Sequence, residues 1–143
     1  MVLNWTYKGE EVTSHKDLHE SCTSIVYELC FSNETKYIGK LVVRSYRRLK
    51  PTKEQLKLRK NYKRVELKDV PFMKYEGSSK ENEDLELLSK EILYQTTDKR
   101  AATYIETALL FENDVLHNEM FNNKNIGGLY FENVLEGLID DRD

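Results

Sequence analysis

Several side chains in this sequence have the chemistry that hydrolysis of a phosphodiester requires. Such a reaction needs an activated water, a cation beside the phosphate and usually a metal ion held by a carboxylate, which neutralises charge as the bond breaks. The candidates, in chain order, are Tyr27, Tyr37, Lys40, Arg47, Glu106 and a cluster of asparagines that includes Asn122 and Asn123. Order along a chain does not make a site, so the elements that position these residues have to be considered.

The two tyrosines fall in segments that are typical of a β-hairpin. Residues 24–31 and 36–43 are rich in Ile, Val, Leu and Tyr, and residues 32–35 (Ser-Asn-Glu-Thr) supply turn chemistry between them. Tyr27 shares strand parity with the apolar residues of its segment. Taken alone it would therefore more often be a core tyrosine than a catalytic one.

Two helices are predicted directly after the hairpin. Residues 43–49 are compatible with a helix that stops before Pro51, because proline lacks a backbone donor and disfavours helical geometry in the residue before it. Thr52 is a suitable N-cap for a second helix over residues 53–65.

A longer amphipathic helix is predicted to carry Glu106. Residues 97–98 offer N-cap oxygens for a helix from Lys99 to about Leu116, and its apolar residues recur at helical spacing, so one broad face is buried. A strand is predicted just before it, at 90–95. A carboxylate beside so apolar a face needs a partner, and a metal ion or Arg47 would supply one.

The charge of the chain is strongly polarised. From Lys40 to Arg64 there are eleven Lys or Arg against Glu54 alone, a net charge of +10, whereas the whole chain has −3 and the remainder therefore −13. Such asymmetry is typical of a surface that binds a polyanion, usually nucleic acid. A merely solvated helix would mix signs to gain i, i+4 pairs. The side chains predicted to contact DNA are Arg44, Arg48, Lys50, Lys53, Lys57, Arg59, Lys60, Lys63 and Arg64.

Length and composition indicate one compact domain of a soluble protein. At 143 residues, the chain can form one core but hardly two. No window approaches the roughly 20 apolar residues of a membrane span, and the N-terminus is unlike a secretory signal, so we expect a cytoplasmic protein without a membrane partner. Cys22 and Cys30 are expected to be reduced, partly buried thiols.

Five separated elements of the chain resemble the GIY-YIG nuclease superfamily. The first motif is present as Ile25-Val26-Tyr27 and the second as Tyr37-Ile38-Gly39, with an arginine eight positions later, a helical glutamate in TYIETALLFENDVL and a late asparagine in FNNKNI. The runs WTYKGEEV, KYIGKLVVRSYRR, KYEGSS and KEILYQ are similar to small single-domain GIY-YIG proteins of tailed bacteriophages. The chain departs from the pattern at Ile25, where the superfamily has glycine, and at Glu76, where the loop commonly has an aromatic residue.

The resemblance implies an α+β fold with a small three-stranded antiparallel sheet flanked by helices, a single domain over residues 1–131 and an acidic tail over 132–143. It also implies cleavage of DNA with one divalent metal ion, usually Mg²⁺. The site residues it implies are Tyr27 and Tyr37 to orient or deprotonate water, Gly39 for close approach, Lys40 to tune a tyrosine or contact phosphate, Arg47 for the scissile phosphate, Glu106 as metal ligand, and Asn123, with adjacent Asn122 left open.

Two other readings stay open at this point. The chain could keep the fold as a catalytically inactive protein that binds DNA or a host partner, and its acidic tail could recruit a host protein or close the domain as a short helix. A monomer with a single site would have to act twice to cut both strands, so a homo-oligomer is possible.

Overall fold

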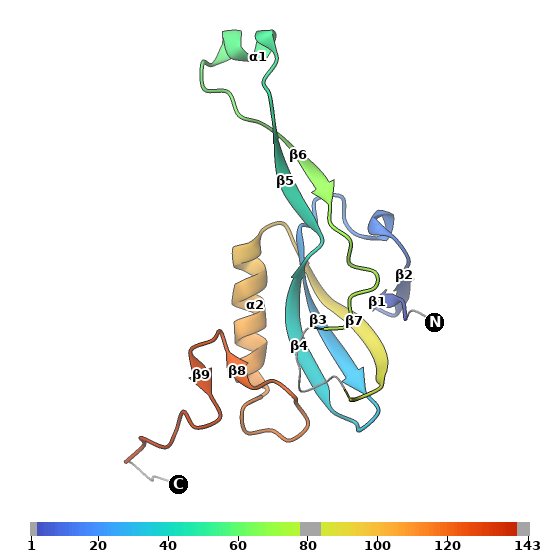
Figure 1. The fold of residues 1–143 in the computed structure, drawn as a ribbon, viewed down its shortest axis with the longest axis vertical. Helices are drawn as coiled ribbons and strands as arrows, with labels where there is room; N and C mark the ends of the chain where they lie inside the picture. Colours follow the sequence, from blue (N-terminus) through green and yellow to red (C-terminus); the bar gives the residue numbers. More distant parts are fainter. Residues whose placement is uncertain (1–2, 78–83, 140–143) are drawn as a thin grey trace.

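The body of the protein is a mixed five-stranded sheet with one long helix on it (Figure 1). The computed structural model describes residues 3–77 and 84–139. The sheet has the order β2-β1-β7-β3-β4. Its strands are β1 (Trp5–Tyr7), β2 (Glu10–Val12), β3 (Ser24–Phe31), β4 (Lys36–Val42) and β7 (Leu87–Thr96).

The prediction of a three-stranded antiparallel sheet was right for the centre of this sheet and wrong for its extent. Strand β3 pairs antiparallel with both β4 and β7, which gives the expected unit, but β1 adds to β7 in parallel and β2 folds back on β1. Lys8 and Gly9 both have positive φ, as a tight two-residue hairpin turn requires. The pairing of β1 with β7 joins residues more than eighty positions apart, which no local pattern could indicate.

Apolar side chains are buried on both faces of the sheet. Along β3, Ile25, Tyr27 and Leu29 enter one cluster with Trp5, while Val26 enters a second cluster on the opposite face. The second cluster lies beneath helix α2 (Lys99–Glu112), which covers that face (Figure 1). Tyr27 lies on the same face of β3 as Ile25 and Leu29, so its side chain is part of the hydrophobic core.

Helix α2 begins as the sequence predicts and ends earlier. The Asp98 side chain accepts a hydrogen bond from the Ala101 amide at 2.7 Å and forms the N-cap. The helix stops at Glu112 instead of about Leu116, where the Asn113 side chain donates to the Leu109 carbonyl at 2.8 Å. Glu106 lies well inside the helix, as expected.

A two-stranded arm replaces the two helices predicted after the hairpin. Residues 44–49 form strand β5 (Arg44–Leu49), and the chain returns as β6 (Arg64–Asp69), antiparallel to it. The predicted helix over 43–49 was therefore wrong, and the predicted helix over 53–65 shrinks to α1 (Lys53–Leu58), whose N-cap Thr52 forms a capping box with Gln55. In Figure 1 the arm projects away from the sheet, with α1 at its far end.

The root of the arm is held by a buried arginine. The Arg44 guanidinium donates to the carbonyls of His15, His19, Glu20 and Cys22 at 2.7 to 3.2 Å, and it also pairs with Asp69 at 3.2 Å. The prediction that Arg44 contacts DNA is therefore not supported by its position, because its donors already bind the backbone of the protein body.

The remaining described segments complete the body. A 3₁₀ turn, η1 (His15–Asp17), precedes β3, and the chain after α2 forms a small hairpin of β8 (Asn125–Ile126) and β9 (Tyr130–Phe131). Cys22 and Cys30 are free thiols, as expected. Over residues 3–77 and 84–139, no helix has the length and apolar character needed to cross a membrane.

Candidate active site

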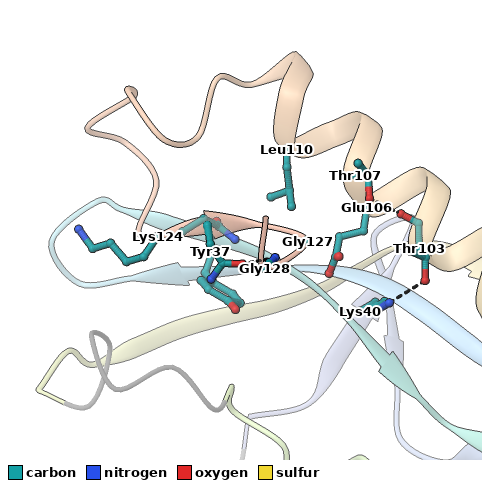
Figure 2. A pocket seen from close by; sticks show the side chains of 11 residues that line it. Tyr37, Lys40, Thr103, Glu106, Thr107, Leu110, Lys124, Gly127 and Gly128 are labelled. Carbon is teal, nitrogen blue, oxygen red and sulfur yellow. Dashed lines mark hydrogen bonds between the residues drawn. The ribbon is translucent and has the colours of Figure 1, made fainter. Parts of the chain in front are cut away.

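A cavity of about 410 Å³ lies where α2, β4 and the turn after α2 meet (Figure 2). Four of the predicted site residues line it: Tyr37, Lys40, Glu106 and Asn123. The other lining residues are Thr103, Thr107, Leu110, Lys124, Asn125, Gly127 and Gly128. The tertiary structure thus brings together residues from positions 37 to 128 of the chain.

Glu106 is the acidic group of this cavity. Its side chain extends from α2 toward β4, from which Lys40 faces the same helix (Figure 2). Burial raises the pKa of Glu106, and the Lys40 ammonium opposes that rise. Lys40 Nζ donates to Thr103 Oγ1 at 2.6 Å, one helical turn before Glu106. A cation and a carboxylate are therefore fixed on facing walls.

Tyr27 lies behind this site rather than in it. Its side chain is 2% exposed, its hydroxyl is 3.2 Å from that of Tyr75, and it is absent from the cavity lining. Burial, and then the hydrogen bond with Tyr75, raise the pKa of Tyr27 far above its ordinary value. Its surroundings therefore favour the protonated hydroxyl in the free protein.

Gly39 is required by the position of Tyr27. The two residues are cross-strand partners on β3 and β4, and a Cβ at Gly39 would lie 2.5 Å from Tyr27 Oη and 2.6 Å from Cζ. The Tyr27 ring cannot easily move aside, because the rings of Trp5 and Tyr75 pack edge-on against it. The glycine thus permits the tyrosine to lie across its neighbouring strand.

Asn123 fastens the turn after α2 to strand β4. Its side chain accepts from the Ile38 amide at 3.1 Å and donates to the Ile38 carbonyl at 2.8 Å, and it is 6% exposed. Asn122 donates from its side chain to Thr35 Oγ1 at 2.6 Å. Both asparagines anchor the turn, but Asn123 is the one that lines the cavity.

Arg47, like Tyr27 and Gly39, is a predicted site residue that does not line the cavity. It lies on β5 in the arm, is largely exposed, and its guanidinium is 3.8 Å from the Glu66 carboxylate. The other cations predicted to contact DNA, apart from Arg44, are also exposed and belong to the arm. The basic segment is therefore an extension beside the body and not a helix face.

The donor set of the cavity fits magnesium with a single protein ligand. Within the described residues, no three His, Cys, Asp or Glu side chains gather where they could hold a metal ion. Magnesium commonly keeps several waters and binds through one or two carboxylates together with substrate phosphate. The Glu106 carboxylate at an open cavity suits that mode, whereas a metal such as zinc, which needs several protein ligands, does not fit.

Sequence reasoning missed the two threonines that flank Glu106 and the tyrosine that touches Tyr27. Thr103, Thr107 and Leu110 share one side of α2 with Glu106, so helical spacing could have assigned them to its site. Tyr75 sits in the KYEGSS run, whose resemblance indicated the loop but not the contact. Its hydroxyl meets Tyr27 only through the tertiary structure.

The structure has a tyrosine on the central strand of a three-stranded antiparallel unit, a tyrosine and a glycine on the adjacent edge strand, and a glutamate on the covering helix. This is the arrangement that the resemblance to the GIY-YIG superfamily implies. The comparison with protein families agrees with this resemblance. The family model described as "Putative endonuclease segE, GIY-YIG domain" matches residues 5–131, and the chain belongs to that family. No curated protein and no solved structure gives a significant match.

Ile25, which stands where the superfamily has glycine, lies in the core. Its side chain is fully buried in the cluster of Trp5 and Leu29 and does not line the cavity. The departure from the first motif therefore changes packing beneath the sheet and leaves the walls of the site untouched.

Proposed function

We propose that this protein is a metal-dependent endonuclease that hydrolyses phosphodiester bonds in DNA, encoded by a bacteriophage and acting in the cytoplasm of its host. The observation that carries the proposal is the Glu106 carboxylate, which shares a cavity with Lys40 and Tyr37 on a GIY-YIG framework. A carboxylate that can hold a metal ion, a cation for the phosphate and a group that can orient water are what water attack on a phosphodiester uses.

Glu106 would hold the metal ion in this proposal. Its oxygens are hard ligands of the kind that Mg²⁺ prefers, and the ion would supply charge neutralisation at the phosphate. Binding needs the ionised carboxylate. The raised pKa of Glu106 therefore makes the site sensitive to mild acid, and the Lys40 ammonium limits that sensitivity.

Tyr37 and Lys40 are the residues proposed to meet the substrate. Tyr37 lines the cavity while its side chain packs against the cluster of Trp5 and Tyr27, and its hydroxyl is the group proposed to orient the attacking water. The Lys40 ammonium is proposed to contact the phosphate. Tyr27 acts through position: its protonated hydroxyl bonds Tyr75 and its ring fixes strand β4 at Gly39. Asn123 completes the support by holding Ile38 next to Tyr37.

The deciding experiment measures nicking of supercoiled plasmid DNA with and without Mg²⁺. We expect Mg²⁺-dependent conversion to open circles by the parent protein and a loss of at least about 100-fold in rate for Glu106→Ala. Glu112→Ala is the matched control, because Glu112 is an exposed glutamate at the end of the same helix. If Glu106→Ala nicks DNA as fast as Glu112→Ala, the assigned site is wrong.

A second candidate is a protein that keeps the fold and binds DNA without cutting it. The position of Arg47 on the arm favours this reading, because the cavity then lacks the arginine expected to hold the scissile phosphate. It predicts salt-sensitive DNA binding and no nicking with Mg²⁺, Mn²⁺ or any other divalent ion.

A further inference from the structure

The arm formed by residues 45–68 has no core of its own and is not covered by the body. Strands β5 and β6 form a separate two-stranded sheet, and every residue from 45 to 69 is at least partly exposed. A two-stranded hairpin without further packing is only marginally stable in water. The base of this hairpin is held by Arg44, which donates to backbone carbonyls of the body, and by His15. The Nε2 atom of His15 lies 3.0 Å from the Val43 carbonyl and 2.9 Å from the Val70 carbonyl. A projecting hairpin that is anchored at its base and exposed along its length is suited to binding another molecule.

The two faces of the arm differ in chemistry. Strand alternation and the register of β5 with β6 place Ser45, Arg47, Leu49, Arg64, Glu66 and Lys68 on one face, which we call the charged face. Tyr46 and Leu67 form a cross-strand pair on the other face, which also carries Arg48 opposite Val65. The cations of the charged face are therefore not needed for the apolar contact between β5 and β6, which Tyr46 and Leu67 provide on the other face.

The charge of the arm identifies the kind of partner. Residues 45–68 hold ten Lys or Arg and two Glu, a net charge of +8. The shaft has six residues per strand, which at the rise of a β-strand is about 20 Å. Dimensions and charge suit duplex DNA, because a two-stranded ribbon fits the major groove, whose edges are lines of phosphates.

We propose that the arm is a β-ribbon that lies in the major groove of duplex DNA, with its charged face toward the bases and its tip cations on the phosphates, and that it binds DNA independently of the cavity. This inference rests on the proposed function for its substrate and adds the mode of binding. Arg47 then serves in DNA binding on the ribbon, which accounts for its position away from the cavity. Glu66, which pairs with Arg47, restrains affinity because it puts a negative charge on the same face.

The first test measures affinity without cleavage. The Glu106→Gln chain in EDTA is titrated with a fluorescent duplex at several salt concentrations. Lys57→Gln with Lys60→Gln, two exposed cations of the tip, should make the loss of affinity between about 50 and 200 mM salt about tenfold smaller, since two phosphate contacts are removed. Lys8→Gln with Lys16→Gln removes two exposed charges of the body and should leave the dependence unchanged. Equal effects of the two pairs would overturn the proposal.

The second test asks for a gain, which misfolding cannot mimic. Glu66→Gln removes the anion beside Arg47 and should tighten binding several-fold, with a steeper dependence on salt. Unchanged or weaker binding by this variant, with melting temperature preserved, would contradict the charged face as the contact surface.

The third test identifies the groove. DNA is methylated with dimethyl sulfate, which modifies guanine N7 in the major groove and adenine N3 in the minor groove, and bound molecules are separated from unbound ones. We expect N7 methylation to exclude DNA from the complex. Interference at adenine N3 alone would place the arm in the minor groove and overturn the proposal. Because the Glu106→Gln chain does not need to cut DNA, these results are independent of whether nicking is observed.

Discussion

At the scale of single residues, the candidate site depends on the Glu106 carboxylate, whose partial burial disfavours its ionised form. Burial raises the pKa of Glu106, so the folded protein binds a proton at this position more tightly than the unfolded chain does. The charged form therefore lowers the stability of the fold once the pH exceeds the ordinary range of glutamate. Such a cost is expected at a site that is built to bind a cation.

Glu106→Gln should raise the melting temperature at about pH 7.5 in EDTA, because glutamine avoids the burial of a charge. The gain should shrink as the pH is lowered toward the ordinary pKa of glutamate, about 4.3, where the parent carboxyl is already neutral. Thermal unfolding followed by circular dichroism across this range checks the sign. A variant that is less stable at pH 7.5 than at pH 5, relative to the parent, would show that Glu106 is stabilised as an anion.

Gly39→Ala should destabilise the protein by about 2 kcal/mol, since the added methyl would overlap the buried Tyr27 ring. Gly137→Ala is the control, because a Cβ there would meet nothing within 4 Å. Urea unfolding of both variants measures the difference. Similar stability of the two would mean that the ring of Tyr27 moves freely.

At the scale of elements, the root of the arm is more important for stability than its shaft. Arg44 and Arg47 lie three residues apart on β5, yet Arg44 is buried among backbone carbonyls and Arg47 is exposed. The same residue type therefore has a structural role at one position and a proposed DNA contact at the other.

Arg44→Ala should cost about 3 kcal/mol of unfolding free energy, because it withdraws a hydrogen-bonded cation from four carbonyls and from Asp69. Arg47→Ala should change stability by less than about 0.5 kcal/mol and should weaken DNA binding instead. Chemical denaturation and DNA titration of the two variants separate these effects. The opposite pattern would mean that the roles of the two arginines are exchanged.

At the scale of the whole molecule, the proposed roles assign DNA binding to the arm and hydrolysis to the cavity. The arm with its basic residues projects from one end of β4 (Figure 1), whereas Glu106 and Tyr37 line the cavity beside α2. Removal of the metal should therefore abolish hydrolysis and leave DNA binding unchanged.

Chelation with EDTA should abolish nicking while the dissociation constant for duplex DNA changes by less than about twofold, after correction for ionic strength. A gel-based nicking assay and an anisotropy titration on the same preparation provide both readouts. Loss of binding in EDTA would show that the metal, and not the arm, holds the DNA.

The sequence by itself determined the hairpin of Tyr27 and Tyr37, the helix of Glu106 and the strongly basic character of residues 40–64. These follow from patterns within one or two elements: alternation, capping, helical spacing and charge. The sequence also limited the late asparagine of the site to Asn122 or Asn123, because the turn that holds both is evident from local sequence. It could not choose between them, because the contacts of their side chains are with a distant segment of the chain.

Only the tertiary structure decided which of these residues meet. The five-stranded sheet, the arm in place of two helices, the burial of Arg44 and the displacement of Arg47 from the cavity all depend on pairing between distant segments. Extended segments find partners through hydrogen bonds across the chain, and residues 44–49 lack an apolar periodicity that would commit them to a helix or a strand alone. The pairing with residues 64–69 settles that choice, and with it the positions of the basic side chains.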